Sequence, residues 1–243
     1  MIKNILVVFI VFLATVNLAY SAAQKNELLL EYKSTTSINN KASLQRGAKY
    51  FVNYCSGCHS LKYMRMSTLA EDLDIDEAIF SKNLLFNNKK IGETMTISMK
   101  EKDAIEWFNA VPPDLSLTAR SKGADYIFSK LNTYYEDDLT ATGYNNIALP
   151  NTSMPNVLAN LQGEQKVIID SNSYPIGLEK VSNGSLSDVE YKQLTNDITN
   201  FLVYVSEPAK LKRYSIGIWV LMFIFIFTII AYFTKKEFWK DVK

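Results

Sequence analysis

The stretch Tyr54–His59, "YCSGCH", contains both cysteines and the single histidine of this 243-residue chain. Two cysteines three positions apart, followed at once by a histidine, place two thiols and an imidazole on about one turn of chain. The rest of the sequence has no further cysteine or histidine. We therefore expect the chemistry of the protein to be concentrated at Cys55, Cys58 and His59.

Four kinds of site could use such a motif. A disulfide would close too short a loop to stabilise a large domain and would not need the histidine. A thioredoxin-like site belongs near a βαβ pattern, whereas the surroundings here are helical. A zinc site would lack a fourth cysteine or histidine ligand. Covalent haem uses every residue, with Cys55 and Cys58 as thioethers and His59 as the proximal iron ligand, so the motif predicts one haem c.

The sixth position of the iron would be filled by methionine, by another group or by nothing. Four methionines are poor candidates. Met64 and Met66 follow His59 too closely to reach the opposite face of the ring, and Met95 and Met99 lie at helical spacing near Ile91, as core residues would. Met154 lies in a polar loop 95 residues after His59. Pro155 favours an extended conformation at Met154, which suits a strap across a ring. We expect Met154 to be the ligand; the alternative is a loop methionine that fills a gap.

The two ends of the chain predict export and membrane anchoring. Residues 1–23 combine an early lysine, an apolar run and small residues, as a signal peptide does; an uncleaved anchor is the alternative. Residues 214–233 are 20 positions without a charge, long enough for one membrane span. We expect a signal peptide at 1–23, a periplasmic haem domain at 24–209, an anchor with its lead-in at 210–233 and a cytoplasmic tail at 234–243. The protein would cross the inner membrane once, in contact with lipid.

Apolar periodicity predicts a mainly α domain between these ends. Three helical faces follow the 3.6-residue period: Leu44, Ala48, Phe51, Val52 and Cys55; Ala124, Ile127, Phe128 and Leu131; and Leu194, Ile198, Phe201, Leu202 and Val205. Ser187–Glu190, "SDVE", predicts a capping box at the start of the third helix, and Pro208 predicts its end. Residues 140–155, rich in Thr, Asn, Gly and Pro, predict a long loop.

Charge limits the partners that we expect. Residues 24–209 hold 18 Lys and Arg against 23 Asp and Glu, a balance of −5, although the whole chain has a formal net charge of +1. An acidic exported domain argues against nucleic acid and allows a basic protein as partner. Two acidic runs, residues 71–77 and 136–138, could attract a basic cytochrome c; solvated surface is the alternative.

The chain resembles the cytochrome c1 family in a bacterial form. The resemblance covers nearly the whole length in the same order: "NYCSGCHSLKYMR" at 53–65, "VPPDLSLTARSKGADYIF" at 111–128, the Met154–Pro155 strap, "FLVYVSEP" at 201–208, one C-terminal anchor and a basic tail. "PPDLS" followed by arginine and then "DYIF" is far more specific than the haem motif alone. The resemblance implies a cytochrome c-like haem domain with insertions plus one C-terminal transmembrane helix.

The resemblance also implies site residues and partners. Arg120 would contact a haem propionate and Tyr126 would lie beside the ring edge. The implied function is one-electron transfer within quinol:cytochrome c oxidoreductase, from the Rieske iron–sulfur protein to cytochrome c, beside cytochrome b in a dimeric complex and without catalysis by this subunit itself. Two other functions remain open: a tethered cytochrome c of another respiratory complex, and a haem enzyme or gas sensor with an open sixth site.

Overall fold

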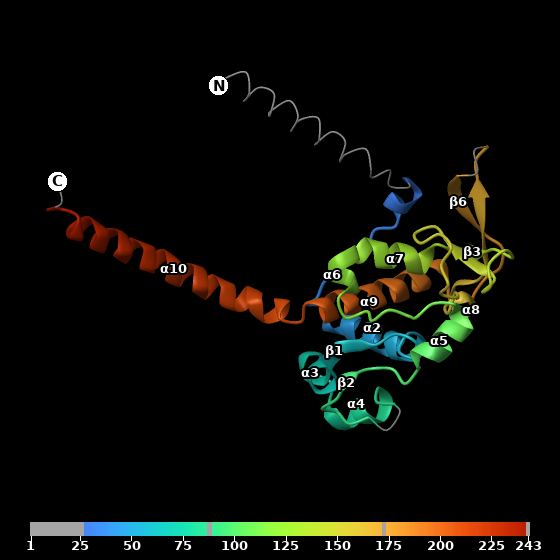
Figure 1. Ribbon diagram of the computed structural model, residues 1–243, viewed down its shortest axis with the longest axis horizontal. Helices are drawn as coiled ribbons and strands as arrows, with labels where there is room; N and C mark the ends of the chain where they lie inside the picture. Colours follow the sequence, from blue (N-terminus) through green and yellow to red (C-terminus); the bar gives the residue numbers. More distant parts are fainter. Residues whose placement is uncertain (1–26, 87–88, 172–173, 242–243) are drawn as a thin grey trace, which may run out of the picture.

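The computed structural model describes residues 27–86, 89–171 and 174–241 (Figure 1). The predicted signal peptide lies outside these residues. About half of the chain is helical, and the described part contains ten helices, which confirms the mainly α fold class. One apolar helix follows the domain at the C-terminal end.

The helices and strands follow one another with short connections. The helices are η1 (Glu27–Glu31), α2 (Lys41–Tyr54), α3 (Met66–Asp72), α4 (Glu77–Asn83), α5 (Glu101–Phe108), α6 (Thr118–Lys122), α7 (Ala124–Asn132), α8 (Ala159–Gln162), α9 (Asp188–Ser206) and α10 (Lys210–Phe238). The strands form three antiparallel pairs: β1 (Leu61–Arg65) with β2 (Thr94–Met95), β3 (Tyr134–Glu136) with β4 (Tyr144–Asn146), and β5 (Gln165–Ile169) with β6 (Pro175–Lys180).

Helices α2 and α9 form the centre of the domain, although about 150 residues separate them (Figure 1). Gly47 permits this close crossing: a Cβ there would lie 2.2 Å from the backbone oxygen of Asp197. One turn further on, the rings of Phe51 and Phe201 are 5.6 Å apart, and both side chains are fully buried. The core is therefore built on the two helical faces that periodicity predicted.

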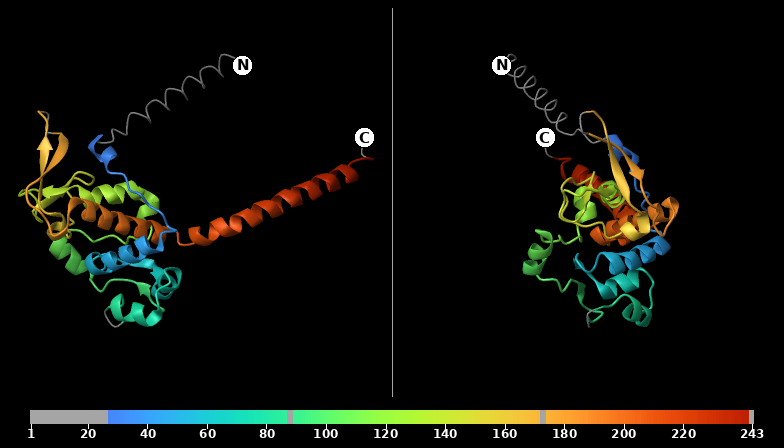
Figure 2. Two further views of the ribbon diagram at one scale, coloured as in Figure 1. Left: turned by 180° about the vertical axis from the view of Figure 1, so that it is seen from behind. Right: turned by 90° about the vertical axis from the view of Figure 1, so that its right-hand side faces the viewer.

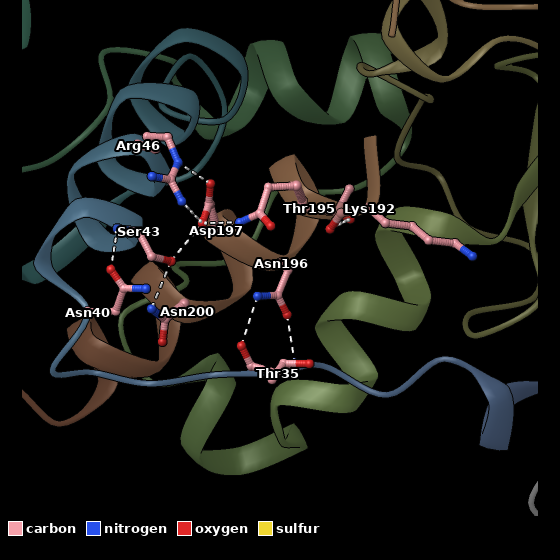
Figure 3. A network of polar contacts seen from close by, with 10 residues as sticks. Thr35, Asn40, Ser43, Arg46, Lys192, Thr195, Asn196, Asp197 and Asn200 are labelled. Atoms are coloured by element: carbon pink, nitrogen blue, oxygen red, sulfur yellow. Dashed lines mark hydrogen bonds and ion pairs between the residues drawn. The ribbon is translucent and has the colours of Figure 1, made fainter. Parts of the chain in front are cut away.

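A buried ion pair joins the same two helices. Asp197 is 1% exposed and accepts hydrogen bonds from Arg46 Nε at 2.6 Å, Arg46 Nη2 at 2.9 Å and Ser43 Oγ at 2.7 Å. Gln193 of α9 donates a fourth bond at 3.0 Å. Figure 3 shows Arg46 and Ser43 of α2 pointing at Asp197 across the helix crossing. Such a carboxylate is tolerable in a core only because its oxygens are paired.

Two asparagines of α9 hold the chain that precedes α2. Asn196 accepts from the backbone N–H of Thr35 and donates to its carbonyl, at 2.7 and 2.8 Å. One turn later, Asn200 makes the same pair of contacts with Ser37, at 2.9 and 3.0 Å. Figure 3 shows Asn196 reaching Thr35 in this way. These side-chain amides satisfy backbone groups that no strand or helix satisfies.

Two expectations from the sequence need correction. The segment 140–155 is not an unbroken loop, because Tyr144–Asn146 pairs with Tyr134–Glu136 as strand β4. Met95 belongs to the core as expected, but it lies on strand β2 rather than on a helix. Both strands are too short for alternation to reveal them.

Helix α9 leads directly into the predicted anchor. Its capping box is present, with Ser187 and Glu190 bonded reciprocally, and the helix ends at Ser206, two residues before Pro208. Helix α10 then extends away from the domain (Figures 1 and 2), and its candidate span, Ile216–Phe238, is not buried against any described part of the chain. The helix continues past Phe233, where we expected the span to end.

Candidate haem site

The CxxCH motif forms a compact turn at the C-terminal end of α2. The backbone N–H of Cys55 donates to Phe51 and thus ends the helix, while the N–H groups of Cys58 and His59 both donate to the carbonyl of Cys55, at 3.1 and 2.8 Å. Cys55 is buried, Cys58 is partly exposed and both are free thiols. The turn therefore presents both thiols and the imidazole from one rigid corner of the domain.

The segment Pro112–Ser116, "PPDLS", lies alongside residues that follow the motif. Leu115 donates its N–H to the carbonyl of Ser60 at 2.9 Å, and the Asp114 carboxylate accepts from the N–H of Lys62 at 2.9 Å. These contacts place the carbonyl of Pro113 2.8 Å from His59 Nδ1. The carbonyl can only accept, so Nδ1 carries the proton and Nε2 keeps its lone pair for a metal.

The surroundings of His59 keep its imidazole neutral. The residue is 9% exposed, and burial lowers its pKa. The hydrogen bond to the Pro113 carbonyl and the negative charge of Asp114 act in the opposite direction and raise the pKa, whereas the positive charge of Lys130 lowers it further. A histidine must be neutral to bind a metal. Burial also raises the pKa of Cys55 to about 12, so this thiol is protonated in the folded chain.

The alternative chemistries of the motif find no support in the described residues. The two cysteines are not paired in a disulfide. Within residues 27–86, 89–171 and 174–241, no three His, Cys, Asp or Glu side chains come together as a metal cluster would require. No thioredoxin-like βαβ unit surrounds the motif, because the three strand pairs of the described chain are all antiparallel.

Helix α7 connects the predicted ring-edge residue with the predicted strap. Tyr126 of α7 is partly buried. The pKa of Tyr134 is raised, mainly by burial; the Thr152 side chain opposes this change, and the negative charge of an ionised Tyr126 would add to it. Thr152 Oγ1 in turn accepts from the N–H of Met154 at 3.3 Å. Met154 itself is partly buried. The Thr152 side chain thus joins the Met154 loop to Tyr134.

The thiols and the histidine test whether these residues fit haem. Cys55 and Cys58 are free, and His59 Nε2 keeps its lone pair because Nδ1 faces the Pro113 carbonyl. Two free thiols and a neutral, oriented imidazole are the groups that a covalently bound haem requires. The Tyr134 hydroxyl is buried, and the Thr152 side chain acts on it.

Arg120 lies at the junction between the domain and α10. Its Nη1 is 3.9 Å from Glu207 Oε1, and Arg213 at the start of α10 pairs with the same carboxylate. The Arg120 side chain is 67% exposed. The structure therefore gives Arg120 a weak internal partner and leaves its predicted contact with a haem propionate untested.

A small hollow beside His59 is lined by two of the four competing methionines. It has a volume of about 40 Å³ and is lined by Met66 and Met95 among others. The hollow has room for a few water molecules and not for a porphyrin. Because Met95 shares it with His59, Met95 is the ligand candidate against which Met154 must be tested.

The first acidic run serves the fold. Asp72 accepts a hydrogen bond from the Tyr204 hydroxyl at 2.7 Å, Asp74 pairs with Lys41, and Asp76 caps α4 by accepting from two backbone N–H groups. These carboxylates already have partners within the domain, but only Lys41 offsets a charge, that of Asp74.

A mainly helical domain with a CxxCH turn, an oriented histidine and a single apolar C-terminal helix defines a membrane-anchored c-type cytochrome. The cytochrome C1 family model matches residues 30–242. The chain therefore belongs to the cytochrome c1 family, as its sequence motifs predicted.

Similar proteins come from several organisms. Cytochrome c1 of Allochromatium vinosum is 43% identical, over 99% of each chain. The ammonia monooxygenase gamma subunit of Nitrosomonas europaea is 37% identical, over 92% of each chain. The mitochondrial cytochrome c1, heme protein, of Saccharomyces cerevisiae is 26% identical, over 83% of this chain and 68% of its own.

Family membership confirms the predicted cofactor, because cytochrome c1 proteins carry a covalently attached c-type haem and are haem subunits of the cytochrome bc1 complex. Three residues with a bearing on the site were not predicted from the sequence: Pro113, Lys130 and Tyr134. Pro113 lies within the recognised "PPDLS" block, which was a usable signal. Lys130 and Tyr134 gave none, since a lysine on a helix and a tyrosine on a three-residue strand are ordinary surface patterns.

Proposed function

We propose that this chain is the electron-transfer subunit of a quinol:cytochrome c oxidoreductase, which passes single electrons from the Rieske iron–sulfur protein to cytochrome c. Cys55 and Cys58 would hold the haem as thioethers, and His59 and Met154 would be the axial ligands. The haem supplies one-electron chemistry when bound. Cytochrome b, the Rieske protein, a cytochrome c acceptor and a second copy of the complex would be the partners.

The contact between His59 Nδ1 and the Pro113 carbonyl is the observation that carries this proposal. It fixes the tautomer and the ring orientation before any metal binds, as electron transfer requires of an axial ligand that must not move between oxidation states. The "PPDLS" segment that supplies the carbonyl is also the block that most specifically resembles cytochrome c1.

Met154 has the role that separates electron transfer from the alternatives. A thioether opposite histidine raises the reduction potential and closes the iron to small ligands. An open sixth position would instead suit an enzyme or a gas sensor. The loop that holds Met154 would thus decide between an electron carrier and a haem that binds substrate.

Replacing Met154 by leucine tests this role, with Met95→Leu as the matched control. Both changes nearly conserve volume, so the cost in stability should stay below about 1.5 kcal/mol. In Met154→Leu the haem should remain attached, the midpoint potential should fall by about 100 mV, which is nearly fifty-fold in the transfer equilibrium, and reduced protein should bind carbon monoxide. Met95→Leu should leave the midpoint potential unchanged and should not allow carbon monoxide to bind. If Met95→Leu lowered the potential and bound carbon monoxide while Met154→Leu did not, the sixth ligand would be Met95.

A second candidate comes from the relative named ammonia monooxygenase gamma subunit, which is 37% identical. A chain of this kind could serve a monooxygenase instead of a quinol:cytochrome c oxidoreductase. Purification from native membranes in mild detergent distinguishes the two. We expect cytochrome b and a Rieske protein in the preparation; recovery with oxygenase subunits and without cytochrome b would favour the second candidate.

The proposed topology places the haem domain in the periplasm and anchors it through α10 in the inner membrane. The apolar span Ile216–Phe238 supports an anchor, while the orientation rests on the predicted signal peptide. Protease added to intact spheroplasts should remove the domain and leave a small fragment from about Lys210 protected. Protection of the whole haem domain would reverse the orientation.

A further inference from the structure

Helix α9 of the domain and the anchor helix α10 meet at Glu207. Only residues 207–209 lie between the two helices. Backbone hydrogen bonds continue through this turn: the N–H of Glu207 donates to the carbonyl of Tyr204, and the carbonyl of Glu207 accepts from the N–H of Lys210, both at 3.0 Å. Figures 1 and 2 show α10 leaving the domain at this point. The connection is therefore a short, hydrogen-bonded turn and not a long tether.

The carboxylate of Glu207 pairs with an arginine on each side of the turn. Its Oε1 atom forms an ion pair with Arg213 of α10 and lies 3.9 Å from Nη1 of Arg120, which belongs to α6. Helix α6 packs against α9 within the domain. The Glu207 side chain is 26% exposed, whereas those of Arg213 and Arg120 are 57% and 67% exposed. One partly enclosed carboxylate thus contacts both the domain and the anchor.

The residues around Glu207 attach the turn to the core. Tyr204, in the last turn of α9, is fully buried and donates its hydroxyl to a carboxylate of α3 at 2.7 Å. Leu211, in the first turn of α10, is partly buried against the same core. The pKa of the Glu207 carboxyl is lowered, mainly by its hydrogen bond with Arg213 and in part by the positive charge of Arg120. Both arginines therefore favour the charged form of this carboxylate.

Beyond this turn, α10 has no attachment of that kind. Its candidate span, Ile216–Phe238, is not buried against any described part of the chain. Within this chain, the angle between the domain and the span is thus set by residues 207–213. A carboxylate that touches cations on two different helices loses one of its contacts when either helix turns. The two ion pairs therefore oppose a change of that angle.

We propose that Glu207 is a positioning residue that fixes the angle between the haem domain and its membrane anchor by pairing with Arg120 and Arg213 at once. With the angle fixed, His59 and the site around it keep one height and one tilt above the membrane. This property belongs to the chain with or without haem. Its value for electron transfer rests on the proposed function.

Two spin labels measure the angle as a distance. Val189→Cys places one label near the start of α9, where the residue is 79% exposed, and Phe225→Cys places the other on the span, where the residue is 68% exposed. Pulsed electron paramagnetic resonance on the full haem-loaded chain in lipid nanodiscs gives the distribution of distances between them. We expect one narrow peak with Glu207 present. In Glu207→Gln the population outside that peak should rise about fivefold, as expected for the loss of two half-exposed ion pairs.

Control variants separate charge from packing. Glu237→Gln removes a glutamate that pairs with Lys240 at the far end of the same helix, 3.5 Å away, and should leave the distribution unchanged. Arg213→Glu brings two carboxylates together and should broaden it. Adding Glu207→Arg to that variant restores opposite charges at the two positions and should narrow the distribution again in part, because Arg120 then lacks its partner. A role of the glutamate stem in packing alone does not predict this recovery.

The outcomes separate the role of Glu207 from the proposed function. An unchanged distribution in Glu207→Gln would overturn that role, and so would a broad distribution in the chain that keeps Glu207, because the turn would then be a hinge. Failure of the exchanged charges to narrow the distribution would overturn it as well. Absence of covalent haem from the purified chain would contradict the proposed function alone, since the same labels report the angle after Cys55 and Cys58 are replaced by serine.

Discussion

Removing Arg46 should destabilise the domain far more than removing an exposed cation from the same helix. The reason is the asymmetry of the ion pair with Asp197: the carboxylate is 1% exposed, whereas the arginine side chain is 46% exposed. In Arg46→Met the carboxylate loses two charge-assisted hydrogen bonds and keeps two neutral donors, Ser43 and Gln193. It cannot reach water freely.

The magnitude follows from what each variant leaves behind. Breaking a buried pair typically costs about 3–5 kcal/mol; the two remaining donors place Arg46→Met near the lower end, at about 3 kcal/mol. Asp197→Asn leaves a half-exposed guanidinium that water can solvate, and should cost about 1–2 kcal/mol. Lys41→Met removes the α2 cation that pairs with Asp74, where both side chains are about half exposed or more, and should cost under about 1 kcal/mol.

Urea unfolding of the full chain in detergent, followed by circular dichroism, measures these differences. With a slope of about 2 kcal/mol per molar urea, Arg46→Met should lower the midpoint by about 1.5 M, and Lys41→Met by less than about 0.5 M. Equal small shifts for both variants would mean that the Arg46 pair behaves as a surface salt bridge. A larger cost for Asp197→Asn than for Arg46→Met would refute the argument from unequal burial.

Three further changes test other contacts. Gly47→Ala forces a Cβ against the backbone oxygen of Asp197, so it should lower the free energy of unfolding in urea by about 3 kcal/mol or more. A urea midpoint near that of the wild type would show that α2 and α9 can move apart without loss of stability. Asp114→Ala removes the acceptor for two backbone N–H groups beside the histidine and should lower the free energy of unfolding by about 1–2 kcal/mol. It also removes a negative charge that acts on His59, so the midpoint potential should rise; an unchanged or lowered potential would contradict this reasoning. Ser187→Ala removes the hydroxyl bond that is the largest cause holding the pKa of Glu190 below its usual value, while the backbone N–H of residue 187 still donates to the carboxylate. That stabilisation is present above the unfolded pKa and is lost as the pH falls through the folded pKa, so the difference in melting temperature between wild type and variant should narrow below about pH 4; a constant difference would contradict it.

Several elements could be predicted because their signals are local. Helix α9 begins at its capping box and buries its predicted face, α2 likewise buries the residues that periodicity selected, and α7 buries all of them except Ala124, which is partly buried. The anchor could be predicted from twenty uncharged positions, since a span depends on length and composition alone. The haem motif could be predicted because its three functional side chains lie within five consecutive residues.

Other elements could not be predicted because their signals are distributed. The three strand pairs are short, and β4 is held by its pairing with β3 and by hydrogen bonds from side chains in or near it. The partners of three carboxylates in the acidic run 71–77 could not be predicted either, because they are Tyr204, Lys41 and backbone N–H groups of α4. Which partner a polar side chain finds depends on segments far away in sequence.

The sequence by itself determined the helices, the anchor and the place of the haem motif, because periodicity, capping and ligand spacing act over a few residues. Only the tertiary structure decided that the Pro113 carbonyl orients His59 and that Arg46 meets Asp197. These contacts join positions 54 to 151 residues apart. They exist because burial of the α2–α9 core brings distant segments together, and the hydrophobic effect that drives this burial does not specify pairs in advance.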